Sequence, residues 1–161
     1  MNPSDKETSR RSVVKSLFTS ITAAGAAVLG VTHARPAEAA DIRKIPDDQE
    51  AAAKRPPLFS GSVTHNGLVY VAGKGEHGPG DITAHTVSVL NQIEAELKKA
   101  GSSMDKVLKV NVYLHDIKDY DAMNEAYRGR FGNSPPVRTT IACYGGIPGS
   151  SLVEIDAIAA V

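Results

Sequence analysis

The sequence predicts a small α/β (α+β) domain of order β-β-α-β-α-β-β, a sheet with two helices on one face. Three observations predict it: an Asn66-Gly67 turn between β-prone segments, two segments with apolar residues every three or four positions, and an alternating strand between them. Two helical crossovers between strands place helices on one face of the sheet. At 161 residues, the chain has room for one such domain.

Residues 1–39 are typical of a leader. Arg10-Arg11, followed by Lys15, matches a twin-arginine signal, and a mildly apolar stretch over 17–31 comes next. That stretch is about 15 residues long, short of the roughly 20 that span a bilayer. Small residues up to Ala39 suit a signal peptidase. We expect cleavage after Ala39, folded export by the twin-arginine machinery to the periplasm, and a mature form without a membrane anchor. The alternative is an amphipathic N-terminal helix that contains Arg-Arg.

Residues 40–57 are charged, contain prolines and lack apolar periodicity, which predicts a flexible linker or arm before a domain at 58–161. The domain opens with a hairpin of Ser60–His65 and Leu68–Gly73, because Asn-Gly favours the positive φ angles of a type I′ turn. The second run is apolar throughout, which indicates a central strand. Residues 73–80 are glycine-rich and predict a loop, but Lys74 lacks the Ser or Thr of a phosphate-binding loop.

The helix over 83–100 starts at a cap from Asp81 or Thr83 and stops at Gly101. Its predicted apolar stripe is Val87, Leu90, Ile93 and Leu97.

The strand over 104–115 alternates, with one set of side chains facing the core: Leu108, Val110, Val112 and Leu114. The opposite set is Lys109, Asn111 and Tyr113. A second helix over 120–131 is expected to bury Tyr120, Met123, Tyr127 and Phe131.

Strands over 139–144 and 152–161 complete the chain. The face of the sheet opposite the helices then keeps apolar residues such as Tyr70, Leu152 and Ile158, and no helix is left to cover them. Packing of sheet faces in an oligomer would cover them.

Composition limits the function classes. The chain has 18 basic and 18 acidic residues and no tryptophan, and its aromatic residues do not alternate with basic clusters as in a nucleic-acid surface. Cys143 is the one cysteine, so no intramolecular disulfide can form, and we expect it to be a small buried hydrophobic residue. The histidines at 65, 77, 85 and 115 show no metal-ligand spacing. We therefore expect no metal, no cofactor and no nucleic acid.

Polar residues in apolar strands are the candidates for chemistry. Arg138 opens a strand with Thr140 on its face, and Glu154 and Asp156 lie in the apolar last strand. A strand of that kind does not bury a carboxylate without a partner. The plain alternative is that each is a solvated charge at the edge of the sheet.

The segment Pro136-Val137-Arg138-Thr139-Thr140-Ile141, and then Leu152-Val153-Glu154-Ile155-Asp156-Ala157-Ile158-Ala159, resembles the C-terminal signature of the Rid (YjgF-like, RidA-type) family of imine/enamine deaminases. The hairpin ending at Ala72-Gly73 and Asn124 in the second helix match in order. The resemblance implies a chorismate-mutase-like fold and a homotrimer with three clefts between subunits.

The resemblance also implies the roles of residues. Arg138 would grip the substrate carboxylate, and Glu154 would position the water that attacks the C=N carbon, releasing ammonia and a 2-oxo acid. Asn124 and Thr140 would contribute to the substrate site. So would Phe59 and Ala72, which stand where family members commonly carry Tyr and Ser. The ligand would be a small imine or enamine that bears a carboxylate.

Two other functions stay open. One is a non-catalytic trimeric binding module that holds small carboxylates with Arg138, which Phe59 and Ala72 favour. The other is the ribonuclease activity attributed to some relatives, which the balanced charge disfavours.

Overall fold

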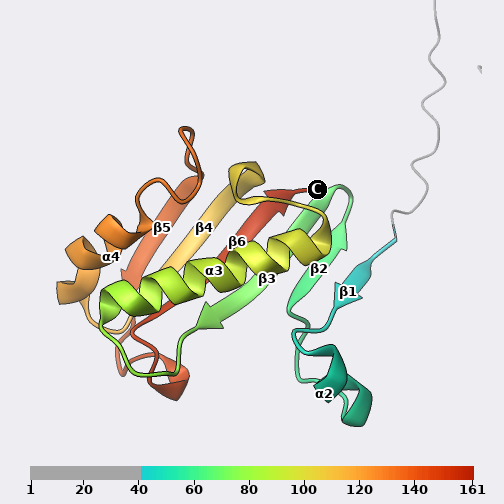
Figure 1. The fold of residues 1–161 in the computed structure, drawn as a ribbon, viewed down its shortest axis with the longest axis horizontal. Helices are drawn as coiled ribbons and strands as arrows, with labels where there is room; N and C mark the ends of the chain where they lie inside the picture. Colours follow the sequence, from blue (N-terminus) through green and yellow to red (C-terminus); the bar gives the residue numbers. More distant parts are fainter. Residues whose placement is uncertain (1–40) are drawn as a thin grey trace, which may run out of the picture. The chain divides into compact units, whose positions relative to one another are not determined.

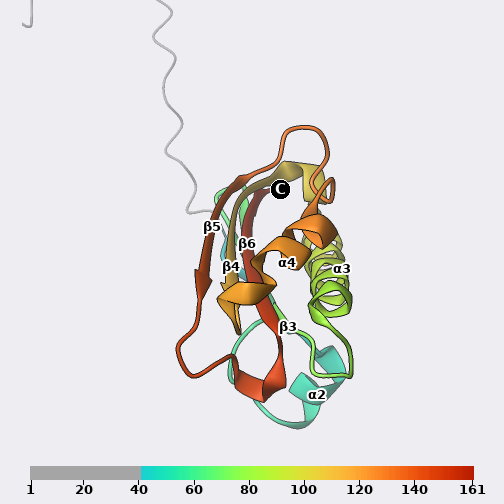
Figure 2. The same ribbon diagram turned by 90° about the vertical axis from the view of Figure 1, so that its left-hand side faces the viewer.

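The computed structural model describes residues 41–161, so the predicted leader and its cleavage site lie outside the described residues. Six strands form one sheet in the order β1-β2-β3-β6-β4-β5, and α3 and α4 lie on the same face of it (Figure 1, Figure 2). The elements are β1 (Arg43–Ile45), α2 (Gln49–Lys54), β2 (Ser62–His65), β3 (Leu68–Gly75), α3 (Ile82–Ala100), β4 (Val107–Leu114), α4 (Tyr120–Tyr127), β5 (Val137–Ala142) and β6 (Val153–Ala160). From β2 onward this is the predicted order.

The hairpin and the position of the last strand organise the sheet. Asn66 and Gly67 connect β2 to β3 with φ angles of 51° and 74°, both positive as a type I′ turn requires. Strand β3 is interior, as its apolar run predicted. Strand β6 inserts between β3 and β4 and is antiparallel to both, whereas β4 and β5 run parallel. The last strand therefore lies at the middle of the sheet.

The hydrophobic core lies between the sheet and α3. Helix α3 begins at Asp81, whose side chain accepts a hydrogen bond of 2.8 Å from the Ala84 N–H, and it ends at Gly101 in the left-handed conformation. Val87 was expected in its buried stripe but is exposed, and Val89 is buried instead, because the stripe follows a different helical face. The largest fully buried side chains include Leu90, Ile93, Leu97, Leu114, Met123 and Ile155.

A β-bulge near the start of β4 makes the predicted alternation wrong at that end of the strand. The register against β6 shifts between Val107 and Lys109. Leu108 is consequently 51% exposed, whereas Val107 is buried. A bulge inserts one residue and reverses the alternation before it, so only Val110, Val112 and Leu114 of the expected set face the core.

Helix α4 is shorter than predicted. It ends at Tyr127, because Arg128 leaves the helical conformation and Gly129 has a φ angle of 75°. Tyr127 and Phe131 are still buried, with ring centroids 4.9 Å apart. Tyr120 was expected in the core but is 39% exposed. The segment between α4 and β5 is therefore a loop that lies beside Arg138.

Residues 40–57 were expected to be a flexible linker or arm, but residues 43–45 form a strand and residues 49–54 a helix. Strand β1 pairs antiparallel with β2 and buries Ile45. Asp48 caps α2 by accepting a 3.0 Å hydrogen bond from the Ala51 N–H. The backbone of Asp47 approaches so closely that a Cβ on Gly61 would lie 2.8 Å from its Cα. Tertiary contacts thus order a segment that has no apolar periodicity of its own.

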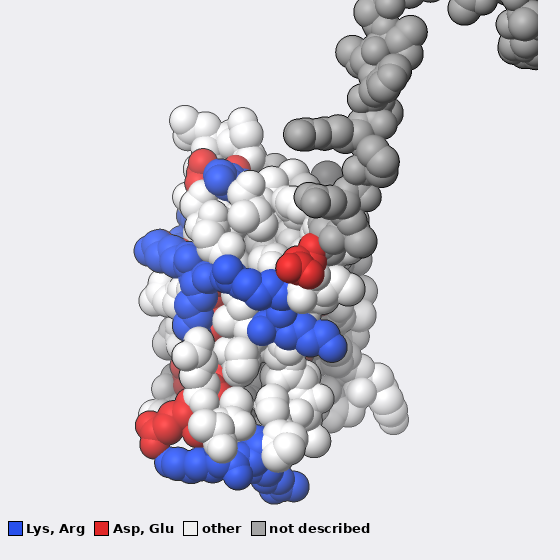
Figure 3. Space-filling view, turned by 90° about the vertical axis from the view of Figure 1, so that its right-hand side faces the viewer, with Lys and Arg blue, Asp and Glu red and all other residues white. Residues whose placement is uncertain are grey.

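A buried lysine attaches this segment to the domain. Strand β3 continues to Gly75, so Lys74 lies in a strand rather than in the expected loop, and it is buried. Its ammonium group pairs with Asp47 and lies 3.8 Å from the Glu96 carboxylate, which Lys99 also binds at 2.6 Å. Figure 3 shows the surface on the β1 and α2 side, where Lys and Arg form a band with Asp and Glu close to it.

The other face of the sheet carries no helix among residues 41–161 (Figure 2). Tyr70 and Ile158 pair across β3 and β6, and Tyr70, Val137 and Ile141 are exposed. Leu152 was expected on this open face but packs against the core, because it precedes β6 at the edge of the helix-covered layer. Within the same residues no helix is long and apolar enough to span a membrane.

Candidate functional site

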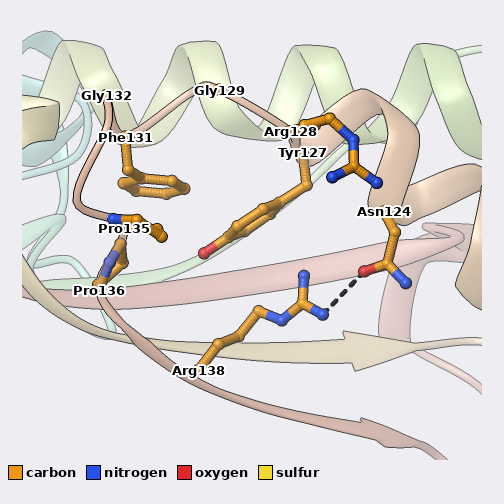
Figure 4. A pocket seen from close by; sticks show the side chains of 9 residues that line it. All are labelled: Asn124, Tyr127, Arg128, Gly129, Phe131, Gly132, Pro135, Pro136 and Arg138. Carbon is orange, nitrogen blue, oxygen red and sulfur yellow. Dashed lines mark hydrogen bonds between the residues drawn. The ribbon is translucent and has the colours of Figure 1, made fainter.

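Helix α4 positions Arg138 on the helix side of the sheet. Arg138 lies beside Val110 in the β4–β5 register, and the side chain of Val110 is in the core. The Arg138 Nη2 donates a 2.8 Å hydrogen bond to Asn124 Oδ1 (Figure 4). Its guanidinium carbon lies 4.7 Å from the centroid of the Tyr127 ring, within the range of a cation–π contact. One of five donors is thus used, and the guanidinium fork stays available to an anion.

A hollow of about 620 Å³ opens beside Arg138. Its wall combines the end of α4, the following loop and the start of β5 (Figure 4). Arg128 stands at its rim, paired at 3.0 Å with the equally exposed Glu125. An ion pair so exposed to solvent is weak and easily exchanged, so Arg128 adds positive charge that a ligand can use.

Two buried hydroxyls on this side have no hydrogen-bond partner within residues 41–161: Tyr127 and Thr140. Burial raises the pKa of Tyr127 to about 12, with the positive charge of Arg138 acting in the opposite direction. The phenol therefore stays protonated and is a hydrogen-bond donor. Buried polar groups are nearly always satisfied, so these two hydroxyls favour a polar ligand or a partner subunit at this site.

Glu154 lies on the opposite, open side of the sheet. Its neighbours Val153 and Ile155 are fully buried under the helices, and alternation turns Glu154 away from them. A Cβ on Gly73 would lie 2.1 Å from Glu154 Oε1, so any larger residue at position 73 would displace the Glu154 carboxylate from its present position. A hollow of about 250 Å³ is lined by Glu154, Gly73, Tyr113, Cys143 and Asp156, among others.

The two carboxylates on this face have different environments. Asp156 accepts hydrogen bonds at both oxygens, 2.8 Å from Asn111 Nδ2 and 3.0 Å from the Tyr113 hydroxyl. The hydrogen bond to Asp156, followed by burial, raises the pKa of Tyr113. Glu154 makes no hydrogen bond within residues 41–161. Asp156 is therefore occupied, and Glu154 is free to bind a water or a substrate.

One copy of the chain does not bring Arg138 and Glu154 together, because they lie on opposite faces of one sheet. Asn124 does join Arg138, and Thr140 lies on the same side. Phe59 joins neither: it is exposed and lines a separate hollow beside α2. Ala72 lines neither hollow, and its N–H donates to the Gly61 carbonyl at 3.0 Å.

One expectation near the site was wrong, and one set of contacts there was not predicted. Cys143 was expected to be a buried hydrophobic residue, but it is half-exposed and lines the hollow of Glu154, because it follows the end of β5. The hydrogen bonds of Tyr113 and Asn111 to Asp156 were not predicted, although strand alternation had placed both residues on the face away from the core. Among residues 41–161 no group of three His, Cys, Asp or Glu could hold a metal ion.

The fold and these hollows define a class: a small α+β domain with a guanidinium pocket on the helix side and a carboxylate hollow on the open side. The profile of the family described as Endoribonuclease L-PSP matches residues 50–161. The chain therefore belongs to this family, whose members are also named YjgF and RutC proteins.

The relatives agree in sequence and in structure. A RutC family protein of Pyrococcus abyssi is 37% identical over 117 residues, 68% of this chain and 91% of the relative. A mouse protein named 2-iminobutanoate/2-iminopropanoate deaminase is 31% identical over 125 residues, 73% of this chain and 91% of the relative. A crystal structure of a YjgF/YER057c/UK114 family member from Mycobacterium tuberculosis superimposes with a TM-score of 0.65 and 29% identity, covering 75% of this chain and all of that one.

Proposed function

We propose that this domain hydrolyses reactive 2-imino or 2-enamino acids to 2-oxo acids and ammonia. The observation that carries the proposal is a guanidinium with unused donors and a carboxylate without a partner, each lining a hollow. The mouse relative, named as a deaminase of two such imino acids, supports the substrate class.

Arg138 binds the substrate carboxylate through its fork, a geometry that a lysine does not copy. Asn124 holds the guanidinium in place at 2.8 Å. With both carboxylate oxygens held, the C=N carbon has one orientation in the site. The loss of translational and rotational entropy has then already occurred on binding, so it does not add to the barrier of the chemical step.

Glu154 acts as the base and proton relay. It takes one proton from the attacking water as the oxygen bonds to the imine carbon, and it delivers that proton to the imine nitrogen. It then moves the hydroxyl proton of the carbinolamine to the nitrogen as the C–N bond breaks. One water is consumed, ammonia and the 2-oxo acid leave, and Glu154 returns as a carboxylate. The reaction needs neither a metal nor a covalent bond between substrate and enzyme, since an imine is already electrophilic.

The proposal places this chemistry at clefts between subunits of a homotrimer. Arg138 and Glu154 lie on opposite faces of the sheet, so a cleft with both needs two copies. A homotrimer exported to the periplasm is part of the same proposal. A mature domain starting at Ala40 would carry 13 basic and 15 acidic residues, which favours a small-molecule partner over RNA.

The test generates imino acids with an amino-acid oxidase in the presence of semicarbazide. The mature domain is expected to lower the initial rate of semicarbazone formation. Arg138→Ala is expected to lose about 10- to 100-fold in kcat/KM, since a charged hydrogen-bonding contact contributes about 1.5–3 kcal/mol. An unchanged semicarbazone rate with the wild-type domain, or equal activity of Arg138→Ala, contradicts the deaminase.

A non-catalytic binding module is the second candidate. Phe59 stands where family members commonly carry Tyr, and Ala72 stands where they commonly carry Ser. Each therefore lacks a side-chain hydroxyl that the resemblance associates with deaminases. In this case calorimetry would show that 2-oxo acids bind to the wild-type domain and bind more weakly to Arg138→Ala. The rate of semicarbazone formation would be the same with and without the domain.

A further inference from the structure

The open face carries four polar side chains in two cross-strand pairs. Tyr113 on β4 lies directly opposite Glu154 on β6, and Asn111 lies opposite Asp156. Residues directly opposite in antiparallel strands have Cβ atoms about 4.5–5.5 Å apart. Tyr113 is therefore a direct neighbour of Glu154, although its hydroxyl reaches diagonally to Asp156.

Asp156 fixes the hydroxyl of Tyr113. The phenol donates its one hydrogen to Asp156 Oδ2 at 3.0 Å, and Asn111 holds the other carboxylate oxygen at 2.8 Å. The phenolic oxygen then keeps its lone pairs as acceptors. Donation to a carboxylate makes such an oxygen a stronger acceptor, because hydrogen bonds in series polarise one another.

Tyr113 and Glu154 line the same hollow of about 250 Å³. A water takes about 30 Å³, so the hollow has room for a water and part of a substrate. Glycine at position 73 leaves space for the Glu154 carboxylate at this wall. The site thus offers two oxygen acceptors, one on each strand.

We propose that Tyr113 is a further catalytic residue, whose phenolic oxygen holds the attacking water together with Glu154. This inference rests on the proposed deaminase function. The water donates one hydrogen to Glu154, which removes it, and the other to Tyr113, which holds it. Both hydrogens are then directed away from the substrate, and a lone pair of the water faces the imine carbon. Tyr113 neither gains nor loses a proton, and its hydrogen stays with Asp156.

A purely structural role is the competing explanation. In that case Tyr113 only joins β4 to β6, and its hydroxyl contributes stability but nothing to the chemical step. Asn111 provides a matched control, because it makes the second hydrogen bond to the same carboxylate but does not line the hollow.

The experiment compares the wild-type mature domain, Tyr113→Phe and Asn111→Ala in the semicarbazide assay. Tyr113→Phe is expected to lower kcat about five- to tenfold with KM unchanged, the effect of one lost hydrogen bond in the transition state. Asn111→Ala is expected to keep kcat within about twofold of wild type.

An unchanged kcat in Tyr113→Phe, or an equal loss in Asn111→Ala, overturns the inference and leaves the deaminase standing. An inactive wild-type domain overturns the proposed function and this inference together. If thermal unfolding shows that Tyr113→Phe does not fold, Asp156→Ala replaces it. That variant removes the acceptor that fixes the Tyr113 hydrogen, so the phenolic oxygen is no longer held as an acceptor for the water, and a kcat equal to wild type would then overturn the inference.

Discussion

Arg138 and Tyr127 line one pocket, but only Arg138 has a hydrogen-bond partner within residues 41–161. Arg138 uses one donor on Asn124 and stacks over the Tyr127 ring. The Tyr127 hydroxyl is buried without a partner within residues 41–161, at an energetic cost that a bound polar group would relieve. At the scale of single residues, the pocket is therefore prepared for a ligand that carries both an anionic group and a further acceptor.

Because the Tyr127 hydroxyl is buried, we expect the domain to lose stability at alkaline pH. Its pKa is raised from 10.0 to about 12 in the folded domain. Between these values the unfolded chain ionises and the folded one does not, so stability is complete below pH 10 and falls as pH rises towards 12. We expect wild type to lose about 2 kcal/mol more than Tyr127→Phe over this interval, measured by urea unfolding. Parallel pH curves for the two proteins would show that Tyr127 is not buried from solvent.

At the scale of elements, one short segment depends on contacts far away in sequence. Strand β1 and helix α2 are held by the β2 edge, by the close approach to Gly61 and by the pairing of Asp47 with Lys74. Lys74 and Glu96 are both buried, and a buried charge is costly unless it is paired. The ion pairs thus connect the segment before β2 to both β3 and α3.

Asp47→Ala is expected to loosen β1 and α2 and to lower the free energy of unfolding by about 1–2 kcal/mol, because Lys74 keeps only the more distant Glu96. Hydrogen exchange over residues 43–54 should become faster, while exchange in β4 and β6 stays slow. Glu50→Ala is the matched control, since it removes an exposed pair with Lys54 on the same segment. Equal exchange in the two variants would mean that Asp47 does not hold the segment.

At the scale of the whole molecule, the two proposed functional groups face apart. Arg138 is on the helix side and Glu154 on the open side. The open side also exposes apolar residues such as Tyr70, Val137 and Ile141. Contact between copies on this face would both cover those residues and supply the missing half of each site.

Complementation tests this arrangement. Arg138→Ala and Glu154→Gln should each keep about a tenth of wild-type activity or less alone, but unfolded together and refolded as a mixture they should recover about a quarter of it, because about one interface in four then pairs two intact residues. Each variant refolded by itself is the control. A monomer mass by sedimentation, or no recovery in a mixture that forms oligomers, would contradict a shared cleft.

The prediction from sequence succeeded where the determinants are local. Asn66-Gly67, the Asp81 and Gly101 caps and the alternation of β4 after its bulge depend on neighbours in the chain, and all are confirmed. It failed where distant contacts decide: the order in residues 43–54, the burial of Lys74 and the bulge at Leu108.

For the candidate site, the sequence by itself determined the residue types and the face of each strand on which they lie. Arg138 with Thr140, Glu154 with Asp156, and Asn111 with Tyr113 follow from a period of two residues, which is a property of the strand alone. The tertiary structure alone decided which faces meet. It placed β6 between β3 and β4, brought Tyr113 beside Glu154 and set Arg138 on the opposite side. The physical reason is that strand order depends on the burial of distant apolar faces against each other, and this depends on the whole chain rather than on any one segment of it.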